Sequence, residues 1–119
     1  MKRLLIVAHG SRRGASNDEV RVLAQRVAEH LQLPANNVQV AFLELALPSI
    51  ETALDECFNN GTDEVSVLPY FLSSGTHVVN DVPREIAAAQ AKWPDKTIKV
   101  LPHIGAAETM ISLISSTYR

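Results

Sequence analysis

Four short apolar runs alternate along the chain with longer stretches of helical periodicity. The runs cover residues 4–8, 38–43, 65–68 and 98–101; the first is continuous, and each of the others contains a single polar residue. A continuous apolar run of this length is typical of a strand buried on both faces. The pattern therefore predicts four strands of a mainly parallel sheet.

The first helix is expected between the first two runs. Residues 16–19 read Ser-Asn-Asp-Glu, which has the form of a capping box, and apolar residues recur at helical spacing after them. This pattern predicts a helix that begins at Ser16 and ends before Pro34. A second helix is predicted to open at Pro48 and Ser49 and to end near Gly61, a typical C-terminal glycine.

Two more helices are expected in the second half of the chain. Asp81 and Val82 precede Pro83, and proline suits the first turn of a helix, so the third helix is predicted to open there. Trp93 and the proline that follows close it. The fourth helix follows Gly105, with apolar residues along one side.

The resulting order is βαβαβαβα, which predicts an α/β fold. Its elements are a four-stranded parallel sheet, right-handed crossovers and helices on both faces. The chain has 119 residues and no linker-like segment, so a single domain over residues 1–119 is expected. Aromatic residues make up only 5% of the chain, and the core therefore depends on Val, Leu, Ile and Ala.

Charge and cysteine content exclude several classes of function. The net charge is −2 and no block of Lys or Arg occurs, so the chain lacks the electrostatic footprint of a nucleic-acid-binding protein. The apolar run near the N-terminus is too short for a signal peptide or a membrane span. The lone Cys57 excludes an internal disulfide and falls on the apolar face of its helix, which favours a buried residue over a reactive thiol. A cytoplasmic location is expected.

In a parallel sheet, functional residues lie in the loops that follow the carboxyl ends of the strands. His9 directly follows the first run, and His77 follows the third through a loop that contains Gly75. In the common strand order 2-1-3-4 these two loops are neighbours, so the two imidazoles are expected to face each other. Two imidazoles with a carboxylate form a common open site for a divalent metal. A structural role for His9, bonding loop carbonyls, is the alternative.

Two acidic residues lie near the same edge. Glu44 interrupts an apolar stretch after the second run, and it is either a solvated strand end or a functional carboxylate. Asp81 lies just before the third helix, where capping of that helix is the favoured interpretation.

The remaining candidates at this edge are basic. Arg12, Arg13 and Arg84 serve either solubility or the binding of a polyanionic substrate, because guanidinium groups pair well with carboxylates. His103 ends the fourth run and is a weaker candidate for lining the site. His30 lies near the end of the first helix, where the helix dipole favours a protonated surface residue.

Four blocks of the sequence resemble the CbiX/SirB-type chelatases, which insert a divalent metal into sirohydrochlorin. Residues 5–12, Leu-Ile-Val-Ala-His-Gly-Ser-Arg, are similar to the opening of that family. Residues 41–50 resemble its second block, residues 67–83 its most specific block, and residues 101–105 its closing strand and loop. The resemblance covers nearly the whole chain.

This resemblance implies a metal site formed by His9 and His77 with Glu44 as the acidic neighbour. It implies a short, single-domain form that pairs as a homodimer, whereas larger relatives carry two fused domains. Such enzymes use no ATP, and the metal is a substrate, with Co²⁺ favoured and Ni²⁺ or Fe²⁺ as alternatives. This chain lacks the histidine-rich run that short members often carry. Residues assigned to substrate binding are Ser11, Arg12, Arg13, Ser74, Gly75, Thr76 and Arg84.

Insertion must remove two pyrrole protons and move the metal to the ring nitrogens. His9 and His77 are expected to bind the metal or accept the protons, with Glu44 as base or ligand. A non-catalytic metal or tetrapyrrole carrier on the same fold is the main alternative. A histidine phosphatase is disfavoured, because those enzymes place an arginine before the histidine and Ala8 stands there.

Overall fold

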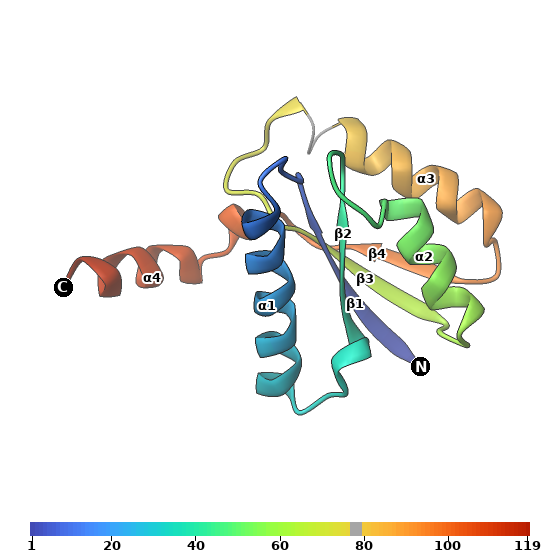
Figure 1. Cartoon of the computed structure of the whole chain (residues 1–119), viewed down its shortest axis with the longest axis horizontal. Helices are drawn as coiled ribbons and strands as arrows, with labels where there is room; N and C mark the ends of the chain where they lie inside the picture. Colours follow the sequence, from blue (N-terminus) through green and yellow to red (C-terminus); the bar gives the residue numbers. More distant parts are fainter. Residues whose placement is uncertain (77–79) are drawn as a thin grey trace.

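A four-stranded parallel sheet forms the centre of the protein in the computed structural model, which describes residues 1–76 and 80–119 (Figure 1). The strand order is β2-β1-β3-β4, as the sequence pattern predicts. All three pairings are parallel. The strands are β1 (Lys2–Ala8), β2 (Val38–Phe42), β3 (Glu64–Pro69) and β4 (Thr97–Val100).

Helices cover both faces of the sheet, which confirms the predicted α/β class (Figure 1). Helix α1 packs on one face, while α2 and α3 pack side by side on the other. Figure 1 shows α4 extending away from the body of the molecule. The helices are α1 (Gly14–Leu31), α2 (Ile50–Asn59), α3 (Val82–Lys92) and α4 (Thr109–Tyr118), with short 3₁₀ turns η1 (Ala35–Asn37) and η3 (Ile104–Ala106).

The alternation of side chains along β1 divides the core into two layers. Leu5 and Val7 are fully buried in the layer beneath α2 and α3. Ile6 points the other way and packs with Ala24 and Ala28 of α1. Because alanine side chains are small, α1 can lie close to the strands. A strand buried on both faces needs a continuous apolar run, which is what residues 4–8 supply.

The predicted start of α1 is wrong by two residues. The helix begins at Gly14, and its N-cap residue Arg13 makes no side-chain capping bond. Ser16 instead accepts a hydrogen bond from the Arg13 guanidinium (3.2 Å). Asn17 is buried, and its amide bonds the backbone of Ser11, which precedes the helix. The Ser-Asn-Asp-Glu sequence therefore does not form a capping box.

The other two predicted helix starts have different outcomes. Ser49 caps α2, since its hydroxyl accepts the Thr52 N–H (3.2 Å) as expected. The predicted capping role of Asp81 is wrong: its side chain makes no capping bond to α3 and pairs with Arg84 (2.9 Å). An arginine one turn further along the helix is in reach and competes for the carboxylate.

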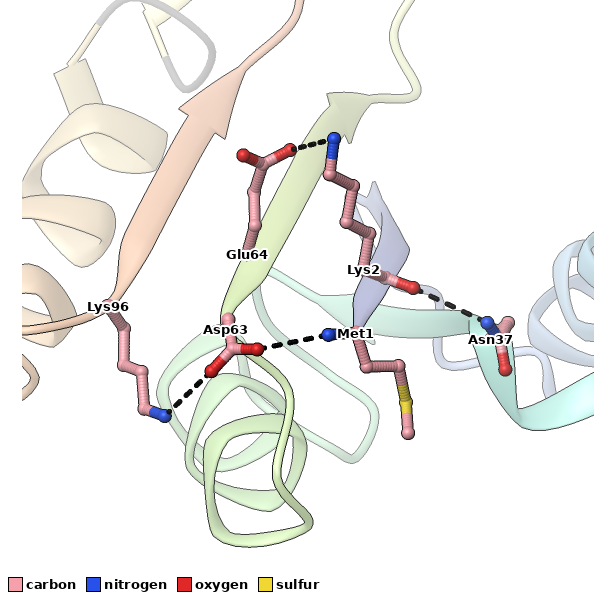
Figure 2. Close-up of polar contacts among 6 residues, drawn as sticks. All are labelled: Met1, Lys2, Asn37, Asp63, Glu64 and Lys96. Carbon is pink, nitrogen blue, oxygen red and sulfur yellow. Dashed lines mark hydrogen bonds and ion pairs between the residues drawn. The ribbon is translucent and has the colours of Figure 1, made fainter.

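Charged groups at the amino ends of the strands tie neighbouring segments together (Figure 2). The Met1 amino group contacts Asp63 (3.0 Å), and Lys96 contacts the same carboxylate (3.5 Å). Lys2 reaches Glu64 across β1 and β3 (3.8 Å). The Met1 amino group, assisted by Lys96, lowers the pKa of Asp63. This cluster lies at the edge opposite to the predicted site.

A second polar contact joins α2 to the end of α3. Asp55 accepts hydrogen bonds from the Lys92 ammonium (2.7 Å) and from the Trp93 indole N–H (2.7 Å). The Trp93 ring in turn contacts Phe58, with ring centroids 5.5 Å apart. The hydrogen bond from Lys92 has the larger effect and that from Trp93 the next, and together they hold the pKa of Asp55 below its ordinary value.

Among the described residues, no helix is long and apolar enough to cross a membrane.

The lowered pKa of Asp55 makes a pH-dependent contribution to stability. The carboxylate of an unfolded chain titrates near pH 3.9, so the contribution is present above about pH 4. It is lost as the pH falls through the lower folded-state value. We expect the Asp55→Asn variant to lose about 1 kcal/mol of unfolding free energy near neutral pH. The loss should shrink towards about pH 2, as measured by urea unfolding at each pH.

Asp18→Asn is the matched control for this experiment. Its carboxylate also pairs with a cation, Arg21 (2.8 Å), but it is 72% exposed, and an exposed pair contributes little. A difference between wild type and Asp55→Asn that stays the same at all pH values would contradict the assignment.

Candidate active site

Backbone hydrogen bonds carry the pairing of β1 and β2 beyond the ends of both strands. The Leu43 N–H donates to the Ala8 carbonyl (2.9 Å), and the Glu44 N–H donates to the His9 carbonyl (3.0 Å). The register of the sheet therefore continues into the loops at the carboxyl edge. As a result, His9 and Glu44 lie side by side although they are far apart in the sequence.

The side chains of His9 and Glu44 form a pair at this edge. His9 Nε2 lies 3.0 Å from Glu44 Oε1, and the two side chains are 44% and 50% exposed. At this distance the imidazole and the carboxylate form an ion pair when the ring is protonated. Both groups remain open to solvent, so a proton or a metal ion can reach them without a rearrangement of the fold.

Gly10 makes this close approach possible. Its φ angle is +97°, and a Cβ atom built on it would lie 1.7 Å from the Glu44 carbonyl oxygen. Any other residue would be strained by the left-handed conformation and would also push Glu44 away. The glycine that follows His9 is thus required for the contact between the two loops.

The loop that carries Glu44 is fixed by contacts that the sequence pattern does not reveal. The Phe42 N–H donates to the Pro48 carbonyl (2.9 Å), which closes the loop at its base. Arg21 of α1 donates to the Leu47 carbonyl (3.1 Å) and lies 5.0 Å from the centre of the Phe42 ring. Leu45 has a positive φ of 67°, a conformation that persists only where surrounding contacts determine it.

A cavity of about 230 Å³ opens beside His9, between the loop after β1 and the start of α1. Its walls include Ser11, Ser16, Asn17 and Tyr70. This volume lies below the range of about 300–1,000 Å³ that is usual for pockets enclosing a drug-sized ligand. The cavity is large enough for a water molecule or a metal ion.

An open apolar groove lies next to this cavity. Two hollows of about 660 and 460 Å³ lie in the angle between α4 and the body, and they share Leu72, Met110 and Leu113. The second hollow reaches Tyr70, which also lines the cavity beside His9. Tyr70 therefore borders both the cavity beside His9 and the apolar groove.

The loops after β3 and β4 pack directly on each other. The Gly105 N–H donates to the Phe71 carbonyl (3.0 Å), and a Cβ on Gly105 would lie 1.8 Å from the Leu72 carbonyl oxygen. His103, at the start of η3, is only partly exposed. The fourth strand thus brings His103 to the same edge as the others, as the sequence predicts.

The structure locates most of the other predicted site residues around this edge. Arg13 is the N-cap residue of α1 and bonds Ser16, and Arg84 pairs with Asp81 at the start of α3. His77 lies outside the described residues. The remaining predicted residues lie in the loops after β1 and β3 and are partly or fully exposed: Ser11, Arg12, Ser74, Gly75 and Thr76.

Within residues 1–76 and 80–119, no three His, Cys, Asp or Glu side chains gather closely enough to hold a metal ion. His9 and Glu44 offer one nitrogen and one oxygen donor. A metal bound there would take its other ligands from water, from the substrate or from residues outside that part of the chain.

Three residues of this region were not identified from the sequence: Asn17, Arg21 and Tyr70. Asn17 lies inside the expected capping box without a role of its own, and Arg21 follows the ordinary pattern of an exposed helix surface. Tyr70 directly follows β3, so its position at the carboxyl edge was the available signal.

Comparison with known proteins agrees with this arrangement. A family model described as CbiX matches residues 3–119. The chain is 29% identical over 111 residues to the sirohydrochlorin ferrochelatase of Bacillus subtilis, covering 93% of this chain and 42% of that protein. It is 32% identical over 95 residues to the sirohydrochlorin cobaltochelatase of Methanopyrus kandleri, covering 80% and 64%.

A solved structure has the same fold. The sirohydrochlorin chelatase SirB from Bacillus subtilis subspecies spizizenii, in complex with cobalt, superposes with a TM-score of 0.84 at 30% identity. The match covers 98% of this chain and 49% of that one. The chain therefore spans about half the length of this relative. Because the family model extends over all but the first two residues, the chain belongs to the CbiX family.

Proposed function

We propose that this protein inserts a divalent metal into sirohydrochlorin or a related tetrapyrrole, without ATP. The observation that carries the proposal is the His9–Glu44 pair, with 3.0 Å between Nε2 and Oε1, at the open edge of the sheet. Similarity to a sirohydrochlorin ferrochelatase and a sirohydrochlorin cobaltochelatase supports the substrate. Cobalt is the favoured metal, and nickel and iron are the alternatives.

The separation of the two atoms suits coordination of one metal ion. Metal–nitrogen and metal–oxygen bonds of about 2.1 Å at right angles place the donor atoms about 3.0 Å apart. His9 Nε2 and Glu44 Oε1 have this spacing. One imidazole and one carboxylate accept cobalt, nickel and iron alike, so the pair itself does not select among them.

The same two atoms can also take up the protons that the reaction releases. Insertion brings one divalent metal ion into the ring and removes two pyrrole protons. A proton and a metal ion compete for His9 Nε2, so the nitrogen becomes available to a pyrrole proton as the metal moves to the ring. Glu44 stabilises the imidazolium that forms. Because both side chains are about half exposed, the proton then passes to water, and the pair can accept the second one.

The remaining predicted residues have roles around this pair. His77 is proposed as the second imidazole of the site, as its position in the family motif implies. Arg12, Arg13 and Arg84 are proposed to meet the carboxylates of the tetrapyrrole, whose ring lies over the edge of the sheet. The small residues of the loop after β3 allow the ring to approach closely: Ser74, Gly75 and Thr76.

We infer that residues 1–119 act as one domain of a cytoplasmic protein. The two apolar layers share one sheet, and each uses residues from both halves of the chain. Cys57 is fully buried, and burial raises the pKa of its thiol, which donates to Gln39 Oε1 (3.3 Å). An unpaired, protonated thiol suits a reducing compartment.

The proposed partner is a second copy of this chain, and α4 is the surface that joins the two copies. Helix α4 carries no charged residue, and it exposes Ile111 (74%), Leu113 (60%), Ile114 (64%) and Tyr118 (91%). Exposed apolar surface of this kind is typical of an interface. Relatives of about twice the length, such as the cobalt-bound SirB, are consistent with a second unit beside this one.

Charges at the two ends of α4 favour an antiparallel arrangement. Glu108 precedes the helix and Arg119 follows it. In a two-fold pair of antiparallel helices, Glu108 of each copy lies near Arg119 of the other. The uncharged stretch between them adds no repulsion, so the two apolar faces can meet.

Mutation of the His9–Glu44 pair tests the reaction. We expect His9→Ala to slow metal insertion at least about a hundredfold, and Glu44→Gln to slow it about tenfold, because a base and its stabilising carboxylate are lost. The measurement is the absorption spectrum of sirohydrochlorin with Co²⁺, Ni²⁺ and Fe²⁺ in turn. His30→Ala, at the far end of α1, is the control and should insert metal at the wild-type rate.

An insertion rate of His9→Ala equal to that of wild type would overturn this mechanism. Sirohydrochlorin bound without turnover, whichever metal is supplied, would instead identify the protein as a carrier.

Substitution on α4 tests the pairing of two copies. We expect Ile114→Glu to convert a dimer to a monomer in analytical ultracentrifugation, because a charge would be buried between the helices. Val22→Glu is the control: Val22 is also an exposed apolar residue (50%), but it lies on α1, and its variant should remain a dimer. The charge reversal Glu108→Arg should weaken association several-fold, and adding Arg119→Glu should restore it. Wild-type protein that stays monomeric at all concentrations would refute the pairing.

A further inference from the structure

Asn17 makes an unusually complete contact with one backbone residue of the candidate site. Its side chain, in the first turns of α1, is only 7% exposed. Its Oδ1 accepts the Ser11 N–H (2.9 Å), and its Nδ2 donates to the Ser11 carbonyl (2.8 Å). Both polar groups of the Ser11 backbone are therefore fixed to α1 by one side chain.

This contact lies on the same tight turn as His9. Ser11 follows His9 by two residues, and Asn17 forms part of the wall of the cavity beside that histidine. The Ser11 hydroxyl also accepts the Arg13 N–H (3.1 Å), which shapes the turn further.

The turn is anchored on two sides, with His9 between the anchors. On one side, Gly10 packs on the Glu44 carbonyl, and the Glu44 N–H bonds the His9 carbonyl. On the other side, Asn17 holds Ser11. Loss of the second anchor would let the backbone after His9 move relative to β2. Because a displacement of about 1 Å at a reactive group can cost about a hundredfold in rate, the second anchor matters for chemistry as well as for folding.

We propose that Asn17 is a positioning residue for His9: its amide fixes the loop so that His9 Nε2 stays within bonding distance of Glu44 Oε1. The catalytic part of this inference rests on the proposed function of the pair. The structural part of the inference is that Asn17 holds the His9 backbone in place through Ser11. This part is independent of the proposed function.

The test is the Asn17→Ala variant of the full chain, with two kinds of measurement. Amide hydrogen exchange at the Glu44 N–H reports on its bond to the His9 carbonyl, and we expect exchange at least about tenfold faster. Co²⁺ alone serves as the binding probe, and its dissociation constant should rise about tenfold. In the insertion assay kcat should fall about tenfold or more, while KM for sirohydrochlorin changes less than about twofold.

Asn37→Ala is the matched control. Asn37 also donates its side-chain N–H to a backbone carbonyl, that of Lys2 (3.3 Å), but at the opposite edge of the sheet (Figure 2). The Asn37→Ala variant should leave the Glu44 N–H exchange rate, the Co²⁺ dissociation constant, kcat and KM unchanged. The Leu101 N–H, which bonds the Val67 carbonyl (2.8 Å), is the internal reference that separates local from global opening.

A second variant guards against a failure of Asn17→Ala to fold. Asn17→Asp keeps an oxygen for the Ser11 N–H but places another oxygen against the Ser11 carbonyl. Hydrogen exchange at the Glu44 N–H should be faster in this variant than in wild type, as in Asn17→Ala.

The outcomes distinguish the two proposals. Unchanged exchange at the Glu44 N–H and unchanged Co²⁺ affinity in a folded Asn17 variant would overturn the role of Asn17. Equal acceleration at Glu44 and Leu101 would also overturn it, because the effect would then be a general loss of stability. If wild-type protein inserts no metal, the proposed function fails, while exchange and Co²⁺ binding still decide the role of Asn17.

Discussion

The hydrogen bond from the Glu44 N–H to the His9 carbonyl is the contact on which the candidate site depends. It extends the pairing of two buried strands by one step into their loops, and so it places an imidazole and a carboxylate together. The bond requires that the two backbones touch, and Gly10 is the residue that allows it. The last backbone hydrogen bond between the segments of β1 and β2 therefore also brings the two side chains of the candidate site together.

Much of the fold follows from the sequence because each strand contains a short, mostly apolar run that is followed by a stretch of helical periodicity. The strand order also follows the common one for such sheets. The position of α4 does not follow. Its apolar spacing indicates a helix, but periodicity does not tell which surface covers the apolar side. Here that side of α4, with Ile111 and Ile114, remains exposed in the single chain.

The site is predictable in part, and the failures have a common cause. Position at the carboxyl edge is enough to select His9 and Glu44 as candidates, although not to show that they touch. Local sequence alone predicts a capping box that opens at Ser16 and a capping role for Asp81. Ser16 and Asp81 each pair with an arginine instead, and Asn17, inside the expected capping box, bonds the Ser11 backbone. His77 remains a prediction, because it lies outside the described residues.

Under the proposed function, the site must hold a metal firmly enough to place it and weakly enough to release it. Two donors that stay half exposed to water satisfy the second condition, since each keeps a competing partner in solvent. The first condition is then met by rigidity rather than by the number of ligands. Gly10 on one side and Asn17 on the other fix the backbone around His9, so the donors need no reorganisation when the metal arrives. In this arrangement the precision of the site comes from backbone contacts, and its reversibility comes from the small number of side chains that the metal must leave.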